Sequence, residues 1–246
     1  MKIEITSYQH GLSEKIRLNL TKDIINNSTA DLLLFSGHTI GFVNDIETLR
    51  TQIQNKKIEV VFELENLNSD KINNCLYRVT NGKLVSLHTN QIFTQSKDIE
   101  GNYELADRLL YEFETNRIIN VKGVSILIIQ CGEINIFKNI QSEENRVEFR
   151  LGDDKSLKDR FDKIFKEINV ILNPMHSPMG NQGKLQKRRE FLSKDKRYYF
   201  SASNTKEESN NLELKSIQYA FYNGNAFTEI ETKRREHSIS RIYEIK

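Results

Sequence analysis

The chain has 246 residues, of which 28% are charged and 37% hydrophobic, and its formal net charge at pH 7 is +2. This length can bury a sizeable core, and the composition is that of a globular protein rather than a disordered one. The small net charge gives no overall attraction to nucleic acid or to a membrane. No apolar run approaches the ~18–20 residues of a spanning helix, and Met1 leads into strand-like sequence without a signal-peptide pattern. Cys75 and Cys131 make no disulfide framework, so we expect a cytoplasmic protein.

The first half of the chain predicts strands that alternate with helices. Ser13 predicts a helix start, because serine is a favoured N-cap residue and apolar residues follow at four-residue spacing. Asn81-Gly82 is typical of a two-residue hairpin turn. Residues 103–113 fit either a helix or an extended loop. In chain order we expect a strand over 2–8, a helix after Ser13, a strand over 30–35, a helix over 45–54, a strand over 58–64, and hairpin strands over 75–78 and 84–88.

The stretch 123–137 contains a β-branched apolar run that is typical of a strand buried on both faces. The run stops at Gln130-Cys131-Gly132-Glu133, so a thiol lies where a buried strand emerges into a turn. Such an edge is where α/β proteins usually place their chemistry. The plainer interpretation is that Cys131 is a small apolar residue that completes the core.

The second half continues the alternation. Apolar residues from Leu157 to Ile168 trace one face of a helix, and a strand over 170–172 leads into a loop that holds the only two prolines, Pro174 and Pro178. A basic helix over 184–197, a strand over 198–202 and a strand pair over 217–221 and 226–230 follow, and we expect the charged segment 233–237 to be solvated. Buried strands alternating with amphipathic helices indicate an α/β layered fold.

Several segments follow one another in an order that carries a family resemblance. They are the strand over 30–35, the hairpin segment 81–90, the segment 124–133 with its Cys-x-Glu ending, and a closing part with Asn173-Pro174, Arg188-Arg189 and 198–204. Together they resemble the nitrilase superfamily of carbon–nitrogen hydrolases over nearly the whole chain. The resemblance implies an α-β-β-α sandwich, a single domain over 1–246, and a homodimer in which the sheets continue across the subunits.

The mechanism of that family uses a glutamate, a lysine and a cysteine. The glutamate draws the thiol proton, the thiolate attacks an amide or nitrile carbon, and the lysine and a backbone N–H stabilise the developing charge. By the resemblance, Cys131 is the nucleophile and the Gly132 N–H is the oxyanion donor. Gly37 stands at the glutamate position, and Asn90, with Gln91 next to it, stands at the lysine position. Two of the three catalytic side chains are therefore missing.

Three residues are candidate substitutes. A general base typically contributes ~10²–10⁴-fold, so its loss is severe unless another group replaces it. His38 could pair with Cys131 if the chain turns at Gly37. Asn90 could donate an amide hydrogen bond to an oxyanion. Glu104 lies where some family members carry an additional acidic residue, and is otherwise a charge on a solvated helix face.

Other conspicuous residues have plainer interpretations. We expect Glu133 to orient its loop by hydrogen bonds, and at most one of Glu63 and Glu65 to face inward. His176 lies in a loop that would border the pocket in this fold, although a lone loop histidine is more often a surface residue. No cluster has metal-ligand spacing, so we expect no metal and no cofactor. The basic cluster of Lys184, Lys187, Arg188 and Arg189 fits a solvated helix face better than a nucleic-acid site.

Three functional hypotheses follow. The first is a nitrilase-like domain with impaired catalysis that acts by binding or scaffolding, as a homodimer or beside a partner protein. The alternative is a divergent Cys131-dependent amidase that forms a thioester with a small amide-type ligand, using His38, Asn90 or Glu104. The weakest is a nucleic-acid accessory protein with a basic helix. The missing glutamate and lysine favour the first hypothesis.

Overall fold

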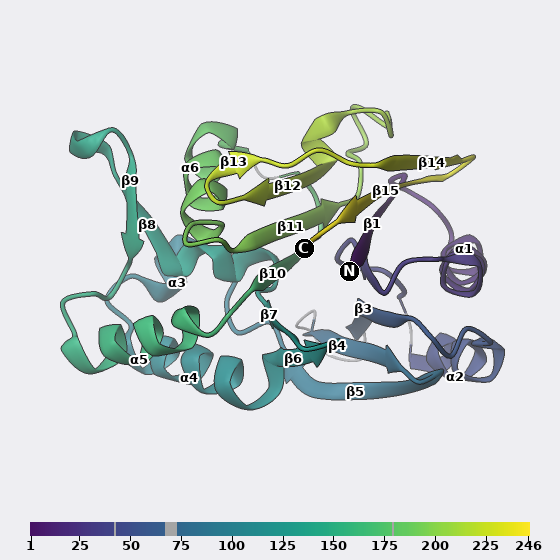
Figure 1. Ribbon diagram of the computed structural model, residues 1–246, viewed down its shortest axis with the longest axis horizontal. Helices are drawn as coiled ribbons and strands as arrows, with labels where there is room; N and C mark the ends of the chain where they lie inside the picture. The colour runs from purple at the N-terminus through teal and green to yellow at the C-terminus, as the bar shows by residue number, and fades with distance from the viewer. Residues whose placement is uncertain (42, 67–72, 179) are drawn as a thin grey trace.

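Two β-sheets lie face to face between two layers of helices (Figure 1). The computed structural model describes residues 1–41, 43–66, 73–178 and 180–246. The first sheet has the order β14-β15-β1-β2-β3-β4-β5, formed by Glu231–Arg235, Ser238–Glu244, Lys2–Tyr8, Leu32–Phe35, Glu59–Asn66, Asn73–Thr80 and Lys83–Asn90. The second has the order β13-β12-β11-β10-β7-β6, formed by Asn225–Ala226, Gln218–Tyr222, Tyr198–Ser203, Val170–Met175, Val124–Ile128 and Ile118–Val121.

The helices cover the outer faces of both sheets, and a separate ribbon, β8–β9, projects from one end of the molecule (Figure 1). The ribbon is formed by Phe137–Ile140 and Arg146–Phe149. The α-helices are α1 Glu14–Asn27, α2 Val43–Gln52, α3 Ser96–Ile99, α4 Tyr103–Glu112, α5 Lys155–Lys166 and α6 Gln182–Leu192. The π-helix η1 covers Phe113–Arg117, and the 3-10 helices are η2 Cys131–Ile136, η3 Gln141–Glu143 and η4 Lys215–Ile217.

The buried strands divide their side chains between two cores, because successive residues of a strand point to opposite faces. In β7, Ile126 and Ile128 enter the core between the sheets, whereas Leu127 and the following Ile129 enter the core under the helices of the second sheet. β2 shows the same division, since Leu34 faces the other sheet and Phe35 faces the helix side. Strands buried on both faces therefore consist of consecutive apolar residues.

Each outer helix layer packs through its own apolar cluster. Residues of α1 and α2 share a cluster with the outer face of the first sheet, and residues of α4, α5 and α6 share one with the second. In the second cluster, Phe149 of β9 stacks on Phe161 of α5 with ring centroids 4.7 Å apart. The predicted α-β-β-α sandwich is thereby confirmed.

Several local predictions can be compared directly. The hairpin turn is confirmed, since Asn81 and Gly82 have φ values of 52° and 72° between β4 and β5, as a type I′ turn requires. The segment 103–113 is helical, and it continues as the π-helix η1. The basic helix α6 ends at Leu192 rather than at residue 197.

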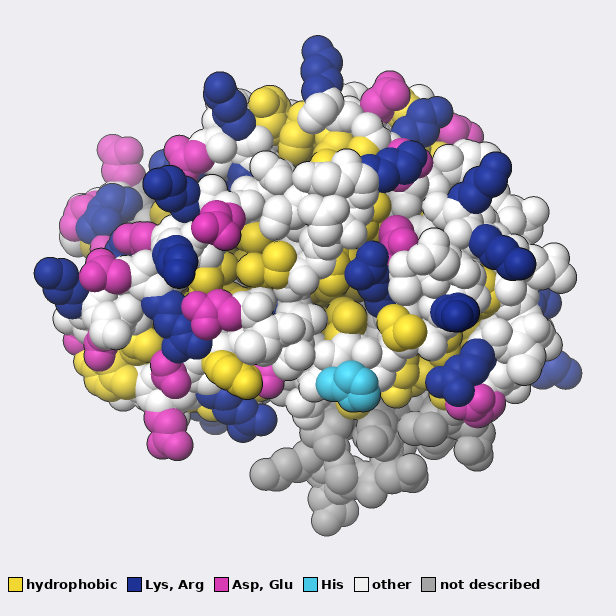
Figure 2. Space-filling view, turned by 60° about the horizontal axis from the view of Figure 1, so that its bottom comes forward, with side chains coloured by type: hydrophobic (Ala, Val, Ile, Leu, Met, Phe, Trp, Pro, Cys, Tyr) yellow, Lys and Arg dark blue, Asp and Glu magenta, His cyan; other side chains and the backbone are white. Residues whose placement is uncertain are grey.

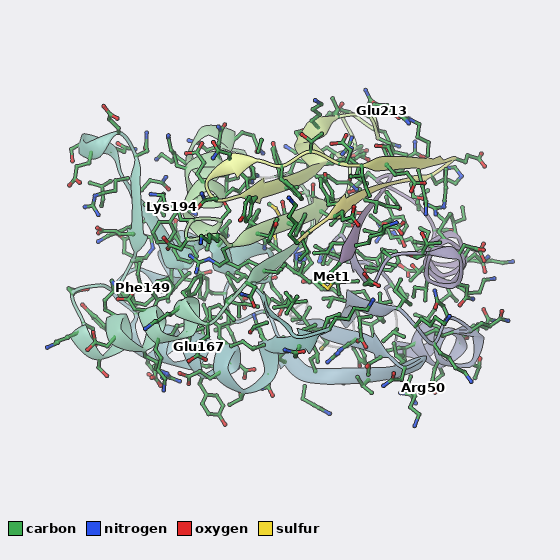
Figure 3. All side chains as sticks on the ribbon, in the orientation of Figure 1. Met1, Arg50, Phe149, Glu167, Lys194 and Glu213 are labelled. Atoms are coloured by element: carbon green, nitrogen blue, oxygen red, sulfur yellow. The ribbon has the colours of Figure 1, made fainter. Side chains whose placement is uncertain are left out.

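The charged segment over 233–237 is partly to fully exposed, as predicted, but most of it forms a strand that was not predicted. Residues 231–235 form β14, and the following β15 lies between β14 and β1 in the first sheet. β15 was not predicted because it contains buried serines. One of them, Ser240, forms a hydrogen bond with Thr6 of β1 at 2.7 Å. The chain ends also meet, since the ammonium of Met1 donates to the carbonyl of Ile245 at 2.8 Å (Figure 3).

The two-sheet core predicts a specific stability pattern. Ile128 is fully buried between the sheets, so Ile128→Ala should lower the free energy of unfolding by about 2–5 kcal/mol. Ile230 is 55% exposed, and Ile230→Ala should change it by no more than about 0.5 kcal/mol. Urea unfolding of both variants measures the difference. Equal effects of the two substitutions would contradict this core arrangement.

Candidate functional site

The site lies where parallel strands of both sheets run toward the same edge. Gly37 and His38 follow β2, Glu63 lies in the second half of β3, Cys131 follows β7, and His176 follows β10. The two sheets are tied together at this edge, because the Gly37 N–H donates to the carbonyl of Met175, the residue before His176, at 2.9 Å. Side chains from four strand ends therefore converge, as is usual at the carboxyl edge of an α/β sheet.

Glu63 is the centre of this convergence. Its side chain is fully buried, and its Oε1 accepts a hydrogen bond from Nε2 of Gln130 at 2.8 Å. Its Oε2 contacts Nε2 of His176 at 2.9 Å and accepts from the backbone N–H of His38 at 3.2 Å. A buried carboxylate must be paired or hydrogen-bonded to remain ionised, and Glu63 has partners on both oxygens.

His176 joins this carboxylate to the thiol. The imidazole contacts Glu63, and it also lies close enough to Cys131 for the thiol to help raise the pKa of the ring. The His38 ring stacks on it with centroids 3.7 Å apart and planes 16° from parallel. Cys131, His176 and Glu63 thus form a chain of thiol, imidazole and carboxylate, which is the arrangement of nucleophile, base and orienting group that defines a catalytic triad.

The electrostatics of the site favour a charged imidazole. Burial lowers the pKa of His176, but the charge of Glu63 and the hydrogen bonds to Cys131 and Glu63 outweigh burial and raise this pKa from 6.5 to about 10. Burial raises the pKa of Glu63, but the charge and hydrogen bond of His176 and the hydrogen bond from Gln130 hold it below its usual value of 4.5. At neutral pH the pair is therefore imidazolium and carboxylate.

Gly37 is required by this arrangement. A Cβ atom at position 37 would meet Cδ2 of His176 at 2.4 Å and Oε2 of Glu63 at 2.8 Å. A side chain at Gly37 and the His176–Glu63 pair therefore exclude each other in the present geometry. The position where the family resemblance expected a glutamate is occupied in space by a carboxylate from the next strand and a histidine from the other sheet.

The turn that carries Cys131 is held from several sides. Gly132 is buried against the backbone of Thr94, whose carbonyl oxygen a Cβ at position 132 would meet at 2.4 Å. Glu133 accepts hydrogen bonds from the backbone N–H groups of Gln130 at 2.9 Å and Ile92 at 2.8 Å, and it pairs with the fully buried Arg117. Glu133 therefore orients the turn by hydrogen bonds, as the sequence predicted.

The candidates from sequence lie in different places. Cys131, Gly132 and His38 are at the site, where the backbone N–H of His38 donates to Glu63, its ring stacks on His176 and its carbonyl accepts from Arg17. Asn90 is half-buried at the end of β5, where its carbonyl accepts from Nη2 of Arg117 at 2.7 Å. Its neighbour Gln91 is the amide beside the nucleophile turn, because Nε2 of Gln91 lies 2.7 Å from a Cβ built on Gly132. Glu104 is exposed on the first turn of α4 rather than in this cluster.

Two residues of the site, His176 and Glu63, are not evident from the sequence. His176 was expected at the surface, yet it lies inside the site, and Glu63 is the inward-facing acid of its strand; the side chain of Glu65 is outside the described residues. The available signal was positional. His176 directly follows a buried strand of the second sheet, and Glu63 lies in a buried strand of the first. The sequence alone does not show which strands of the two sheets lie opposite each other, so it does not show that these two side chains meet.

The basic cluster is not the solvated face that its sequence suggested. Arg188 and Arg189 are buried, with exposed fractions of 8% and 1%, so only part of the cluster is available to solvent. Arg189 lies over the ring of Tyr219 at 3.5 Å from its centroid. Figure 2 shows Lys and Arg side chains interspersed with Asp and Glu across the face in view, without a continuous basic area.

A cavity of about 420 Å³ borders the site. Its walls include the two stacked rings of His38 and His176, together with Arg17 and Asn204. Within the described ranges, no three His, Cys, Asp or Glu side chains are grouped so as to hold a metal ion. Likewise, no helix in the described part of the chain has the length and hydrophobicity needed to cross a bilayer.

Comparisons with known proteins place this architecture. No family model and no curated protein matches the sequence. The structure is similar to an amidase from Nesterenkonia sp. AN1, with a TM-score of 0.59 and 10% identity, covering 100% of this chain and 93% of that chain. A mutant of that amidase with serine in place of a cysteine, described as a member of the nitrilase superfamily, gives a TM-score of 0.58 at 9% identity, covering 100% and 92%.

This chain has the nitrilase-type fold. A glutamine-dependent NAD(+) synthetase from Cytophaga hutchinsonii is also similar, with a TM-score of 0.56 and 15% identity, covering 93% of this chain but 40% of that chain. These identities are so low that the likeness concerns the fold alone. The fold that the sequence motifs implied is thus confirmed, and the chemistry has to be argued from the residues of this chain.

The buried pair predicts a characteristic pH dependence of stability. Because the pKa of His176 is raised above 6.5, its contribution is complete below about pH 6.5 and is lost as the pH rises toward 10. Because the pKa of Glu63 is lowered, its contribution is present above about pH 4.5 and is lost at more acidic pH. The free energy of unfolding of the wild-type protein should therefore exceed that of His176→Gln most strongly between about pH 4.5 and pH 6.5, by about 3–5 kcal/mol.

Urea unfolding at intervals from pH 5 to 10 measures this difference. The matched control is His237→Gln, since His237 lies away from the site and bonds Gln9 at 2.9 Å. A difference between wild type and His176→Gln that stays constant from pH 6 to 10 would show that His176 is not held as a cation by Glu63.

Proposed function

We propose that this chain is a cysteine-dependent carbon–nitrogen hydrolase that cleaves small amides through a thioester. Cys131 is the nucleophile, His176 is the general acid and base, and Glu63 orients and charges the imidazole. The observation that carries the proposal is that His176 contacts a fully buried carboxylate and also lies close enough to the thiol of Cys131 to interact with it. A thiolate beside an imidazolium is a reactive nucleophile at neutral pH, whereas an ordinary thiol, with a pKa near ~8.5, is mostly protonated.

The reaction follows from these positions. The Cys131 sulfur attacks the amide carbonyl carbon, and the carbonyl oxygen takes up negative charge. The imidazolium of His176 gives its proton to the nitrogen as the C–N bond breaks, which releases the amine or ammonia and leaves a thioester. Neutral His176 then takes a proton from water as the water oxygen attacks the thioester carbon. The acid leaves, and thiolate and imidazolium are restored.

The oxyanion is the group that the missing lysine would have stabilised. Gly132 lies in the first turn of η2, where backbone N–H groups have no partner within the helix, so its N–H is the candidate donor. One such donor typically contributes ~10²–10³-fold. In this proposal a backbone dipole replaces the lysine cation, and His176 with Glu63 replaces the glutamate base.

The similar amidase supports an amide as the substrate class. In its structures, acrylamide and the acetamide moiety of fluoroacetamide are attached to the active-site cysteine, and butyramide is bound. We also propose that the chain works as one domain over 1–246, as a homodimer and in the cytoplasm, for which the family resemblance and the free thiols of Cys75 and Cys131 are the support.

The scaffold hypothesis rested on the loss of the family's glutamate and lysine. That loss is a weaker argument once His176 lies beside the thiol and the carboxylate of Glu63 contacts His176, and the candidate substitutes Asn90 and Glu104 are then not needed. Scaffolding without catalysis stays a prediction that requires Cys131 to be unreactive. The two hypotheses therefore differ in one measurable property, the reactivity of this thiol.

The pH dependence of alkylation measures that property. On a Cys75→Ala background, iodoacetamide should modify Cys131 at pH 6 almost as fast as at pH 8. His176→Gln should lower the rate at pH 6 by about 10²-fold, because an unassisted thiol is less than about 1% ionised there. His237→Gln is the matched control and should leave the rate unchanged.

Peptide mass mapping identifies the modified residue, and ammonia release from small amides such as butyramide, absent in Cys131→Ala, identifies the reaction. An alkylation rate that rises only above pH 8, and that His176→Gln leaves unchanged, would refute the triad. That result would favour the hypothesis of a scaffold without catalysis.

A further inference from the structure

A second cavity, distinct from the one beside His176, is strongly cationic. It measures about 400 Å³ and lies between η2, the β8–β9 ribbon and the start of α6. Four of its lining side chains are basic, and none of its described lining residues is acidic. The four are Lys138, Arg150, Lys184 and Arg188. A recessed wall with charges of one sign concentrates the electrostatic field inside the cavity.

Arg188 is held rigidly at the cavity by neutral groups. Its Nε donates to Oδ1 of Asn139 at 2.9 Å, and its Nη1 donates to Oδ1 of Asn135 at 2.9 Å and to the carbonyl of Ile134 at 3.3 Å. Its exposed fraction is 8%. Neither a carboxylate hydrogen bond nor an ion pair is recorded for it within the described residues, and its Nη2 donates to none of them.

Arg150 presents a second guanidinium in the same way. Its Nε donates to the carbonyl of Asn135 at 2.9 Å and its Nη2 to that of Phe137 at 3.4 Å, while its Nη1 makes no recorded bond to a described residue. Both arginines thus use some donors to fix their planes against η2 and the ribbon. Each keeps a terminal nitrogen that is not committed to the described part of the chain.

The two guanidinium groups repel each other. Burial lowers the pKa of Arg188 to about 10, and the charge of Arg150 contributes to the lowering. Burial also lowers the pKa of Arg150, against the opposing charge of Glu100. Among the four basic side chains, Lys138 has its charge partly neutralised, because it forms an ion pair with Glu148 at 3.1 Å. Buried cations are normally neutralised by an anion, and for Arg188 the described chain supplies none.

We propose that this cavity binds an oxyanion, the phosphate or carboxylate group of a small acidic molecule, between Arg150, Arg188 and Lys184. Guanidinium groups with fixed planes suit such groups, because their paired N–H donors match two oxygens. The cavity also includes Asn181, the N-cap of the 11-residue helix α6, whose positive end adds to the attraction.

The position of the cavity leaves two sources for this anion. Asn135 is four residues after Cys131 in η2, a distance of about 8 Å at the ~2 Å rise of a 3-10 helix. The anion is therefore either the acidic end of a molecule that reaches Cys131 or a separate ligand. Binding itself does not depend on the chemistry of Cys131, so its test is independent of the proposed hydrolase activity.

Isothermal titration of the full chain with inorganic phosphate and with malonate tests the proposal. Saturable binding is expected at low ionic strength, and it should weaken as sodium chloride screens the cations. Arg188→Gln should weaken it at least about tenfold, as expected for the loss of a charged hydrogen-bond donor. Lys187→Gln is the matched control on the same helix, because Lys187 is exposed, pairs with Glu190 at 3.2 Å and should leave affinity unchanged.

Should Arg188→Gln fail to fold, the double variant Arg150→Gln/Lys184→Gln provides the same test with half-buried residues. No saturable binding to wild-type protein, or equal affinity in wild type and in these variants, would overturn the site. Once binding is found, the alkylation rate of Cys131 under saturating phosphate or malonate distinguishes the sources. A lowered rate indicates the acidic end of an active-site ligand, and an unchanged rate indicates a separate anion.

Discussion

The convergence of strands at the site depends on the buried carboxylate of Glu63. Taking an ionised carboxylate out of water costs several kcal/mol, so Glu63 can remain charged only where partners surround it. Those partners come from Gln130 just after β7, from His176 just after β10 and from the backbone of His38 after β2. The charge of Glu63 therefore fixes three chain segments from both sheets around one point, and the thiol follows Gln130 directly.

This constraint also explains why the chain departs from the pattern that its motifs resemble. With His176 against Glu63, no side chain fits at Gly37, so a glutamate there and the present pair are alternative ways of placing a carboxylate near the thiol. The glycine at position 37 is therefore matched by the Glu63–His176 pair, which needs the space that a side chain there would fill. The fold provides the strand ends, and the chain uses different ones to surround Cys131.

The sequence was sufficient for the layers but only in part for the site. Buried strands such as β2 and β7 are legible because apolar residues dominate them, and the Asn81-Gly82 turn has its own backbone signature. His176, Arg188 and β15 were misjudged for a shared reason: each is a polar residue or segment buried by partners distant in sequence. The residues around His176 in the sequence give no indication that it contacts Glu63, which lies 113 positions earlier. Such pairs become visible only when both sheets are assembled.

The most direct test of this account is an NMR titration of the His176 imidazole in wild-type protein and in Glu63→Gln. The account predicts that the wild-type ring stays protonated through neutral pH and titrates near pH 10, and that Glu63→Gln loses most of this upward shift. A wild-type ring that titrates near its ordinary 6.5, or a titration that Glu63→Gln leaves unchanged, would contradict the claim that the buried carboxylate holds a charged imidazole against Cys131.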